Sequence, residues 1–103
     1  MDDTQQYIYV SRLVNKNALS HPTPEEQRIV GEHLAYLKAK FESGEIVQAG
    51  LCLDNAFGVV VFRARSEAEA TRFMNSDPAI RQGVTTAEFH PFHVTMADPS
   101  KLL

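Results

Sequence analysis

Apolar and polar positions along the chain follow two different periods, and these periods predict the elements of the fold. Two segments, after Thr23 and after Ser66, carry apolar residues at helical spacing and begin with capping boxes. Four segments are rich in β-branched and aromatic residues, which is typical of strands: residues 7–13, 46–53, 56–63 and 85–96. The order β-α-β-β-α-β predicts an α+β, ferredoxin-like fold with a four-stranded antiparallel sheet.

The first helix is the most strongly specified element. Thr23 and Glu26 form its capping box, and Pro24 loses no hydrogen bond at the first helical position. Gly44 is a natural C-terminal stop. Apolar residues recur every three or four positions and predict one buried stripe, made of Val30, Leu34, Leu37 and Phe41. At about 100° per residue, His33 lies roughly 60° from the centre of that stripe, so we expect its ring at the border of the buried face.

The third strand has apolar side chains on both faces: Phe57, Val59 and Val61 on one, Val60 and Phe62 on the other. A sheet that meets water on one side should alternate apolar with polar residues. We therefore expect helices on one face and a second copy of the chain on the other, in a homodimer or a higher even oligomer. Pro91 lacks an amide donor, which predicts that the last strand is an edge or carries a bulge. Asp54 and Asn55 predict a two-residue turn before the third strand.

Length and composition indicate one domain over residues 1–103, with a disordered lead of about residues 1–5 and a tail of about residues 97–103. The net charge of −3 argues against nucleic acid as a partner. No apolar run approaches the ~20 residues that span a bilayer, and the first residues lack the features of a signal peptide. A single cysteine, Cys52, fits a reducing compartment. These features predict a cytoplasmic protein without a membrane partner.

Three residues are candidates for chemistry. His33 is the default general acid or base, because histidine titrates nearest to physiological pH; a packed histidine bonded to a backbone carbonyl is the alternative. Asp77 follows a helix C-terminus, where a carboxylate meets the negative end of the dipole. Alternatively, Asp77 is the N-cap of a short helical turn that begins at Pro78. The two roles are compatible, because a capping carboxylate can still accept a hydrogen bond from an imidazole. Arg12 ends the first strand, where it can bind an anionic group of a substrate or be a plain surface arginine.

Other chemistry has little support in the sequence. His90 and His93 are three residues apart on a predicted strand, so they face opposite sides and cannot share a metal without a bulge at Pro91. The chain has no glycine-rich phosphate loop and no nucleophile elbow. We therefore expect no metal and no cofactor. The tyrosines are assigned to the core or to an interface: Tyr7, Tyr9 and Tyr36.

Four segments in order carry a further signal: EHLAYL (residues 32–37), GEIVQAG (44–50), SDPAIRQGV (76–84) and PF (91–92). With them the chain resembles, from Tyr7 to about Val94, the YciI-like (YCII-related) family of the dimeric α/β-barrel superfamily. The resemblance implies a ferredoxin-like protomer whose sheets pair face to face, a dimeric α/β barrel. It also implies that His33 and Asp77 match the histidine and aspartate of that family's active site.

Some members of the family resemble enzymes that act on small aromatic or lactone metabolites, including dehalogenation by elimination. We therefore expect a small cofactor-free enzyme, in which His33 moves a proton on a small aromatic or carbonyl-containing metabolite and Asp77 orients the imidazole. The alternative is a non-catalytic dimer that binds an unknown small molecule or a protein partner.

Overall fold

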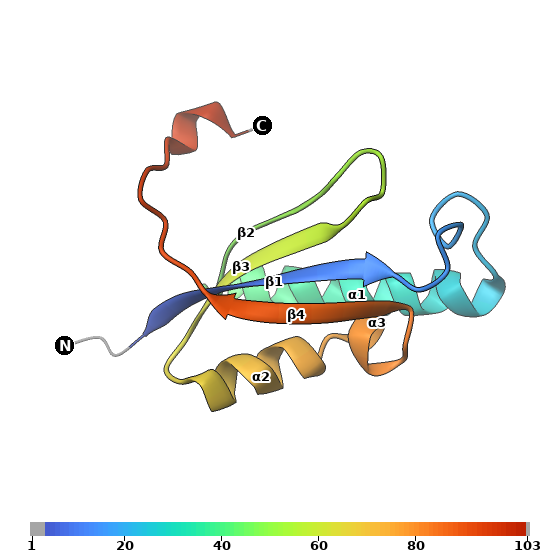
Figure 1. The fold of residues 1–103 in the computed structure, drawn as a ribbon, viewed down its shortest axis with the longest axis horizontal. Helices are drawn as coiled ribbons and strands as arrows, with labels where there is room; N and C mark the ends of the chain where they lie inside the picture. Colours follow the sequence, from blue (N-terminus) through green and yellow to red (C-terminus); the bar gives the residue numbers. More distant parts are fainter. Residues whose placement is uncertain (1–3, 103) are drawn as a thin grey trace.

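The structure is a computed structural model that describes residues 4–102 of the chain. Its elements are β1 (Gln5–Leu13), α1 (Pro24–Glu42), β2 (Ile46–Leu51), β3 (Gly58–Ala64), α2 (Glu67–Asn75), α3 (Pro78–Arg81), β4 (Thr85–Pro91) and the 3₁₀ helix η1 (Pro99–Lys101). The strands form one antiparallel sheet in the order β2-β3-β1-β4 (Figure 1). This order is the ferredoxin-like arrangement that the sequence predicts. The strand that contains Pro91 lies at an edge, also as predicted.

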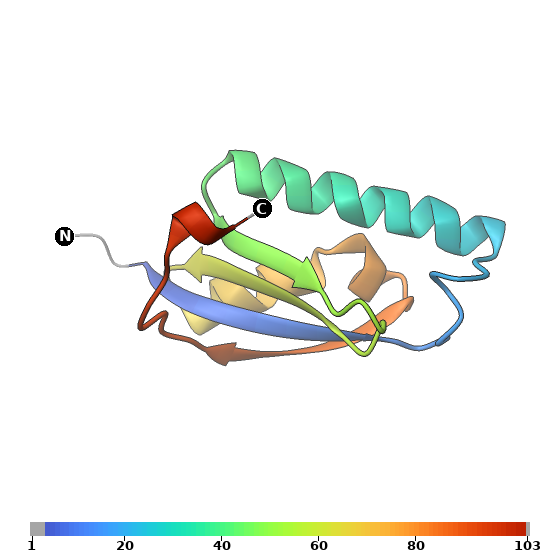
Figure 2. The same ribbon diagram turned by 90° about the horizontal axis from the view of Figure 1, so that it is seen from above.

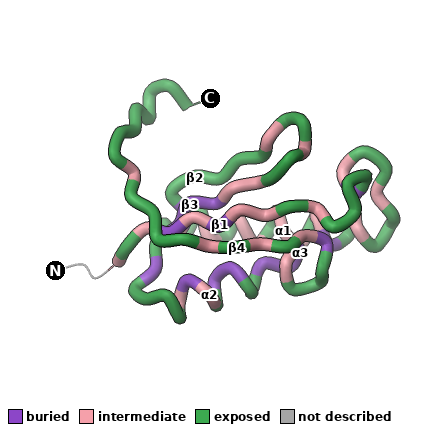
Figure 3. Tube along the Cα trace, in the orientation of Figure 1, coloured by how far each residue is buried: buried purple, intermediate pink, exposed green. Residues whose placement is uncertain are grey.

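The helices α1, α2 and α3 lie on one side of the sheet (Figures 1 and 2). The core lies between them and the sheet, because alternate residues of β1 and β3 point to this side. Tyr9 and Phe62 are fully buried there, with ring centroids 5.6 Å apart, and Phe62 stacks on Phe73 of α2 at 4.3 Å. Figure 3 shows the buried positions along α2 and the central strands. Alternation places Ser11 on the same face of β1 as Tyr9, nearer the end of the strand.

The buried face of α1 differs from the predicted stripe. Ile29 is 4% exposed, whereas Leu34 and Phe41 are each 60% exposed, so the prediction that these two residues are buried is wrong. The face of α1 that points towards the sheet is rotated by about one residue from the predicted stripe. It includes His33 and Tyr36, both half-buried. Tyr36 donates its hydroxyl to a backbone carbonyl of α2, 2.6 Å away. Polar side chains with partners occupy the inward face, and a search for apolar periodicity does not detect them.

Several boundaries also differ from prediction. The connection between β2 and β3 comprises residues 52–57 in place of a two-residue turn, although Asn55 adopts the expected left-handed conformation, with φ 62°. The loop is longer than predicted because the last hydrogen bond between the two chain segments joins the Cys52 amide to the Phe57 carbonyl, at 2.9 Å. β4 ends at Pro91, where the amide donor is missing, and not at residue 96. β1 begins at Gln5, inside the predicted disordered lead, and residues 1–3 of that lead lie outside the described residues.

Candidate active site

The structure brings together two of the three predicted site residues. His33 comes from the middle of α1, and Asp77 lies at the junction between α2 and α3. His33 Nδ1 and Asp77 Oδ1 are 2.7 Å apart, although the residues are 44 positions apart in sequence. A carboxylate only accepts hydrogen bonds, so His33 Nδ1 donates to it. In the tautomer with its one proton on Nδ1, the ring has a free lone pair on Nε2, which a general base requires.

Asp77 is fully buried, and its carboxylate is compensated by three donors. Oδ1 accepts from His33 and from the backbone amide of Ala79 at 3.0 Å, while Oδ2 accepts from the Tyr9 hydroxyl at 2.7 Å. A buried charge is tolerated only when it is paired and hydrogen-bonded in this way. The contact with Ala79 is the N-cap of α3, which the Asp-Pro sequence predicts. One side chain therefore caps a helix and orients the histidine.

Tyr9 is the residue of this site that the sequence did not identify. Its ring is in the core, as predicted, but its hydroxyl also donates to Asp77. Burial, then the Asp77 charge and the hydrogen bond to it, raise the pKa of the Tyr9 phenol, which keeps it protonated as a donor. A signal did exist in the sequence, because a tyrosine on the core face of a central strand needs a buried partner for its hydroxyl.

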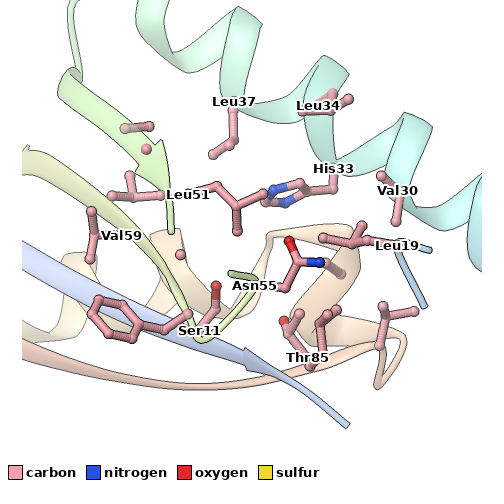
Figure 4. Close-up of a pocket in the computed structure, with 18 residues that line it drawn as sticks. Ser11, Leu19, Val30, His33, Leu34, Leu37, Leu51, Asn55, Val59 and Thr85 are labelled. Carbon is pink, nitrogen blue, oxygen red and sulfur yellow. The ribbon is translucent and has the colours of Figure 1, made fainter. Parts of the chain in front are cut away.

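A cavity of about 390 Å³ lies between α1 and the sheet, and His33 forms part of its wall. Figure 4 shows the His33 ring reaching from α1 into this space, with Ser11, Asn55 and Thr85 on the opposite side. The His33 side chain is 24% exposed, so a ligand can reach it, while Asp77 behind it is sealed from water. The volume is at the lower end of the range for small-molecule pockets, about 300–1,000 Å³.

The lining of this cavity is mostly apolar, and His33 is its one titratable side chain. Its walls include Val30, Leu34, Leu37, Leu51, Phe57 and Val84. The polar side chains are few: His33, Ser11, Asn55 and Thr85. No aspartate, glutamate, lysine or arginine is among the lining residues. Such a cavity excludes bulk water from part of the His33 ring and suits a small, largely apolar molecule.

The structure does not bring Arg12 to this cavity. Its side chain is 54% exposed, pairs with Glu88 at 3.3 Å and lies over the Phe57 ring, whose centroid is 5.6 Å from the guanidinium carbon. Binding of a substrate by Arg12 stays a prediction.

Among residues 4–102 no three His, Cys, Asp or Glu side chains gather where they could hold a metal ion. In the same range no helix has the length and apolar character needed to cross a bilayer.

Fold and site together define the class of protein: a ferredoxin-like α+β domain in which a buried aspartate hydrogen-bonds a histidine at the wall of an apolar cavity. The chain belongs to the YCII-related domain family, whose model matches residues 8–92. A comparison with curated proteins found no match.

One solved structure similar to this chain is that of 5-chloro-2-hydroxyhydroquinone dehydrochlorinase from Burkholderia phenoliruptrix, in complex with 2,5-dihydroxybenzoquinone. The TM-score is 0.63, and the match covers 84% of this chain and 93% of the other at 18% sequence identity. At this level of identity the similarity establishes the fold alone.

Proposed function

We propose that this protein is a small cofactor-free enzyme that uses His33 and Asp77 for acid–base chemistry on a small aromatic or carbonyl-containing metabolite. The single observation that carries the proposal is the 2.7 Å contact between the His33 imidazole and the buried Asp77 carboxylate, on a ring that lines an apolar cavity. Family membership and the fold shared with a dehydrochlorinase support an enzyme of this kind.

In the proposed chemistry, His33 Nε2 takes a proton from an acidic carbon or hydroxyl of the substrate. The imidazolium that forms carries its second proton on Nδ1, where the Asp77 carboxylate stabilises the positive charge. The Tyr9 hydroxyl and the Ala79 amide hold the carboxylate in place, so no reorganisation is needed when the charge appears. The imidazolium then returns its proton to another atom of the substrate or to a leaving group.

A test of this proposal uses a chlorinated hydroquinone, the substrate class that the name of the similar enzyme gives. Wild-type protein and His33→Gln are incubated with 5-chloro-2-hydroxyhydroquinone, and chloride release is followed. We expect His33→Gln to lower turnover about 10²–10⁴-fold, the usual contribution of a positioned acid–base group. The matched control is His21→Gln, because His21 is exposed in the loop between β1 and α1 and does not line the cavity.

Turnover that is the same in wild type and His33→Gln would overturn the acid–base role. If the wild type binds this compound without releasing chloride, further carbonyl probes are assayed for exchange of carbon-bound hydrogen in D₂O. Exchange that requires His33 supports the proposal even when the physiological substrate differs.

A non-catalytic binding role is the second candidate, and the exposed apolar side chains near the cavity favour it. Leu34 and Leu51 line the cavity, and these residues are 60% and 53% exposed; Leu53 of the adjoining loop is 100% exposed. Such a rim suits capture of an apolar ligand or contact with a partner. Saturable binding of a probe by both wild type and His33→Gln, with no product and no exchange in either, would favour this second role.

We further propose that the helix-free face of the sheet binds a second copy of the chain. By strand alternation and register this face carries the neighbouring pairs Ile8–Val61 and Val10–Val59. Sedimentation equilibrium should find a dimer for wild type and a monomer for Val10→Asp, because the new charge would be buried in the interface. Leu34→Asp, on the other side of the molecule, is the control and should remain dimeric. A monomeric wild type at micromolar concentration contradicts the proposal.

A further inference from the structure

Three polar groups on the cavity wall are open to a ligand and have no partner in the protein: His33 Nε2, the Ser11 hydroxyl and the Asn55 carboxamide. Within residues 4–102 none of the three is hydrogen-bonded to another group. In the same range Thr85 Oγ1 is the unpaired side-chain polar atom that is buried, with less than 1 Å² of accessible surface, so a ligand does not reach it. The other three groups are therefore accessible from the cavity.

The loop between β2 and β3 holds Asn55 at this wall. The backbone of Asn55 has φ 62°, a left-handed conformation that glycine, asparagine and aspartate adopt most readily. Its amide donates to the Cys52 carbonyl at 2.8 Å, and the Cys52 amide donates to the Phe57 carbonyl at 2.9 Å. Glycine would satisfy this backbone equally well, so the turn by itself does not require a carboxamide. The loop thus presents a preorganised donor and acceptor to the cavity.

Ser11 provides the second polar group on this wall. It pairs with Gly58 in the β1–β3 ladder, and a Cβ at position 58 would lie 3.3 Å from Ser11 Oγ. The absence of a side chain at Gly58 therefore leaves space beside the Ser11 hydroxyl. Figure 4 shows Ser11 and Asn55 across the cavity from the His33 ring. Polar groups thus lie on two opposite walls, and most of the lining between them is apolar.

These two walls indicate which ligand would satisfy both. On one wall, a neutral His33 ring accepts a hydrogen bond from a hydroxyl, and an imidazolium pairs with an oxyanion. On the other wall, a carboxamide and a hydroxyl each donate and accept, so an oxygen atom suits them better than a methyl group. The apolar side chains between the walls suit a single ring.

We propose that the cavity binds a ring that carries an acidic hydroxyl at His33 and a second oxygen, hydroxyl or carbonyl, that hydrogen-bonds the Asn55 carboxamide, with Ser11 beside it. Asn55 is then the residue that selects a ring with two oxygen substituents over a ring with one. This inference rests on the proposed function, which places the reacting group of the same ligand at His33.

Binding of matched probes tests the role of Asn55 without turnover. The probes are 4-hydroxybenzyl alcohol with 4-ethylphenol, and the 3-substituted isomers of both. Within each pair the phenol is retained and the shape is similar, but a hydroxyl in one probe replaces a methyl group in the other. Dissociation constants are taken at one pH from amide shifts of ¹⁵N-labelled protein at residues that line the cavity. The measured quantity is the ratio of the constant for the ethylphenol to that for the hydroxybenzyl alcohol.

Asn55→Gly keeps the left-handed turn and removes the carboxamide. Both members of a pair lose the same apolar contacts, so a change in the ratio reports the hydrogen bond. We expect the ratio to fall about fivefold to tenfold in at least one pair, the effect of losing one hydrogen bond to the ligand. The matched control is Asn17→Gly, because Asn17 is exposed in the loop between β1 and α1 and does not line the cavity. This control should leave the ratio unchanged.

Three outcomes would overturn the inference: ratios unchanged by Asn55→Gly, an equal fall in Asn17→Gly, or no probe bound in the cavity. A ratio lowered by Ser11→Ala but not by Asn55→Gly would assign the second oxygen to Ser11 and also overturn the role of Asn55. None of these results bears on proton transfer, because loss of turnover in His33→Gln is measured separately. The acid–base proposal and the ligand proposal can therefore fail independently.

Discussion

The contact between Tyr9 and Asp77 predicts that one substitution has opposite effects on stability in two backgrounds. In the wild type, Tyr9→Phe removes a 2.7 Å hydrogen bond to a fully buried carboxylate. In Asp77→Ala the Tyr9 hydroxyl has already lost its acceptor, so Tyr9→Phe removes an orphan polar group instead of a hydrogen bond. The sign of the effect should therefore depend on residue 77.

The magnitudes follow from burial and hydrogen bonding. A hydrogen bond to a charged group contributes about 1.5–3 kcal/mol, and this is the expected cost of Tyr9→Phe in the wild type. An unsatisfied buried hydroxyl costs about 1–3 kcal/mol, so in Asp77→Ala the same substitution should be neutral or stabilising. The coupling energy between the two residues is then at least about 1.5–3 kcal/mol. Asp77→Ala alone should lose roughly 2–5 kcal/mol, since it also uncaps α3 at Ala79.

Urea unfolding followed by far-ultraviolet circular dichroism, at one fixed protein concentration, measures all four variants. Asp98→Ala is the matched control, because Asp98 also caps a short helix before a proline and accepts from the Ser100 amide at 3.1 Å. Asp98 is exposed, so its loss should cost about 1 kcal/mol or less. Equal costs of Tyr9→Phe in the wild type and in Asp77→Ala would refute the reasoning.

Two further predictions follow from burial. Burial and Asp77 raise the pKa of Tyr9 above the value near 10 that it has in the unfolded chain, so the folded state keeps a proton that the unfolded state loses. Stability should fall as pH rises above about 10, and Tyr9→Phe should flatten that fall; equal slopes in urea unfolding between about pH 9 and 11 contradict this. Ile29→Ala should cost about 2–5 kcal/mol, whereas Leu34→Ala, at an exposed position, should cost less than about 1 kcal/mol. Equal costs would contradict the difference in burial between Ile29 and Leu34 that the structure shows.

Short-range features of this fold were predictable from the sequence because they depend on residues within one turn of a helix. The capping box of Thr23 and Glu26 is present with both of its hydrogen bonds. Asp77 caps the helix that begins at Pro78, as its place before a proline indicates. The order of strands and helices followed from the two periods of apolar residues, and only a few topologies are compatible with that order.

Prediction failed where an element meets a partner distant in sequence. The apolar period of α1 indicated that Leu34 and Phe41 are buried, but the helix turns a different side to the sheet. On that side His33 bonds Asp77 and Tyr36 bonds a carbonyl of α2. These contacts determine the rotation of the helix, and apolar periodicity contains no information about them. The same limit applies to the loop between β2 and β3, whose width depends on how the two strands pair.

For the candidate site, the sequence by itself determined the residue types and the element that carries each one. A histidine within a helix and an aspartate at a helix junction are local facts, and so is a tyrosine on the core face of a strand. Only the tertiary structure decided that His33, Asp77 and Tyr9 converge and that Thr85 Oγ1 is left without a partner. The physical reason is that hydrogen bonds act over about 3 Å, whereas these residues come from separate elements whose relative positions are fixed only when α1 and the α2–α3 junction pack on the sheet.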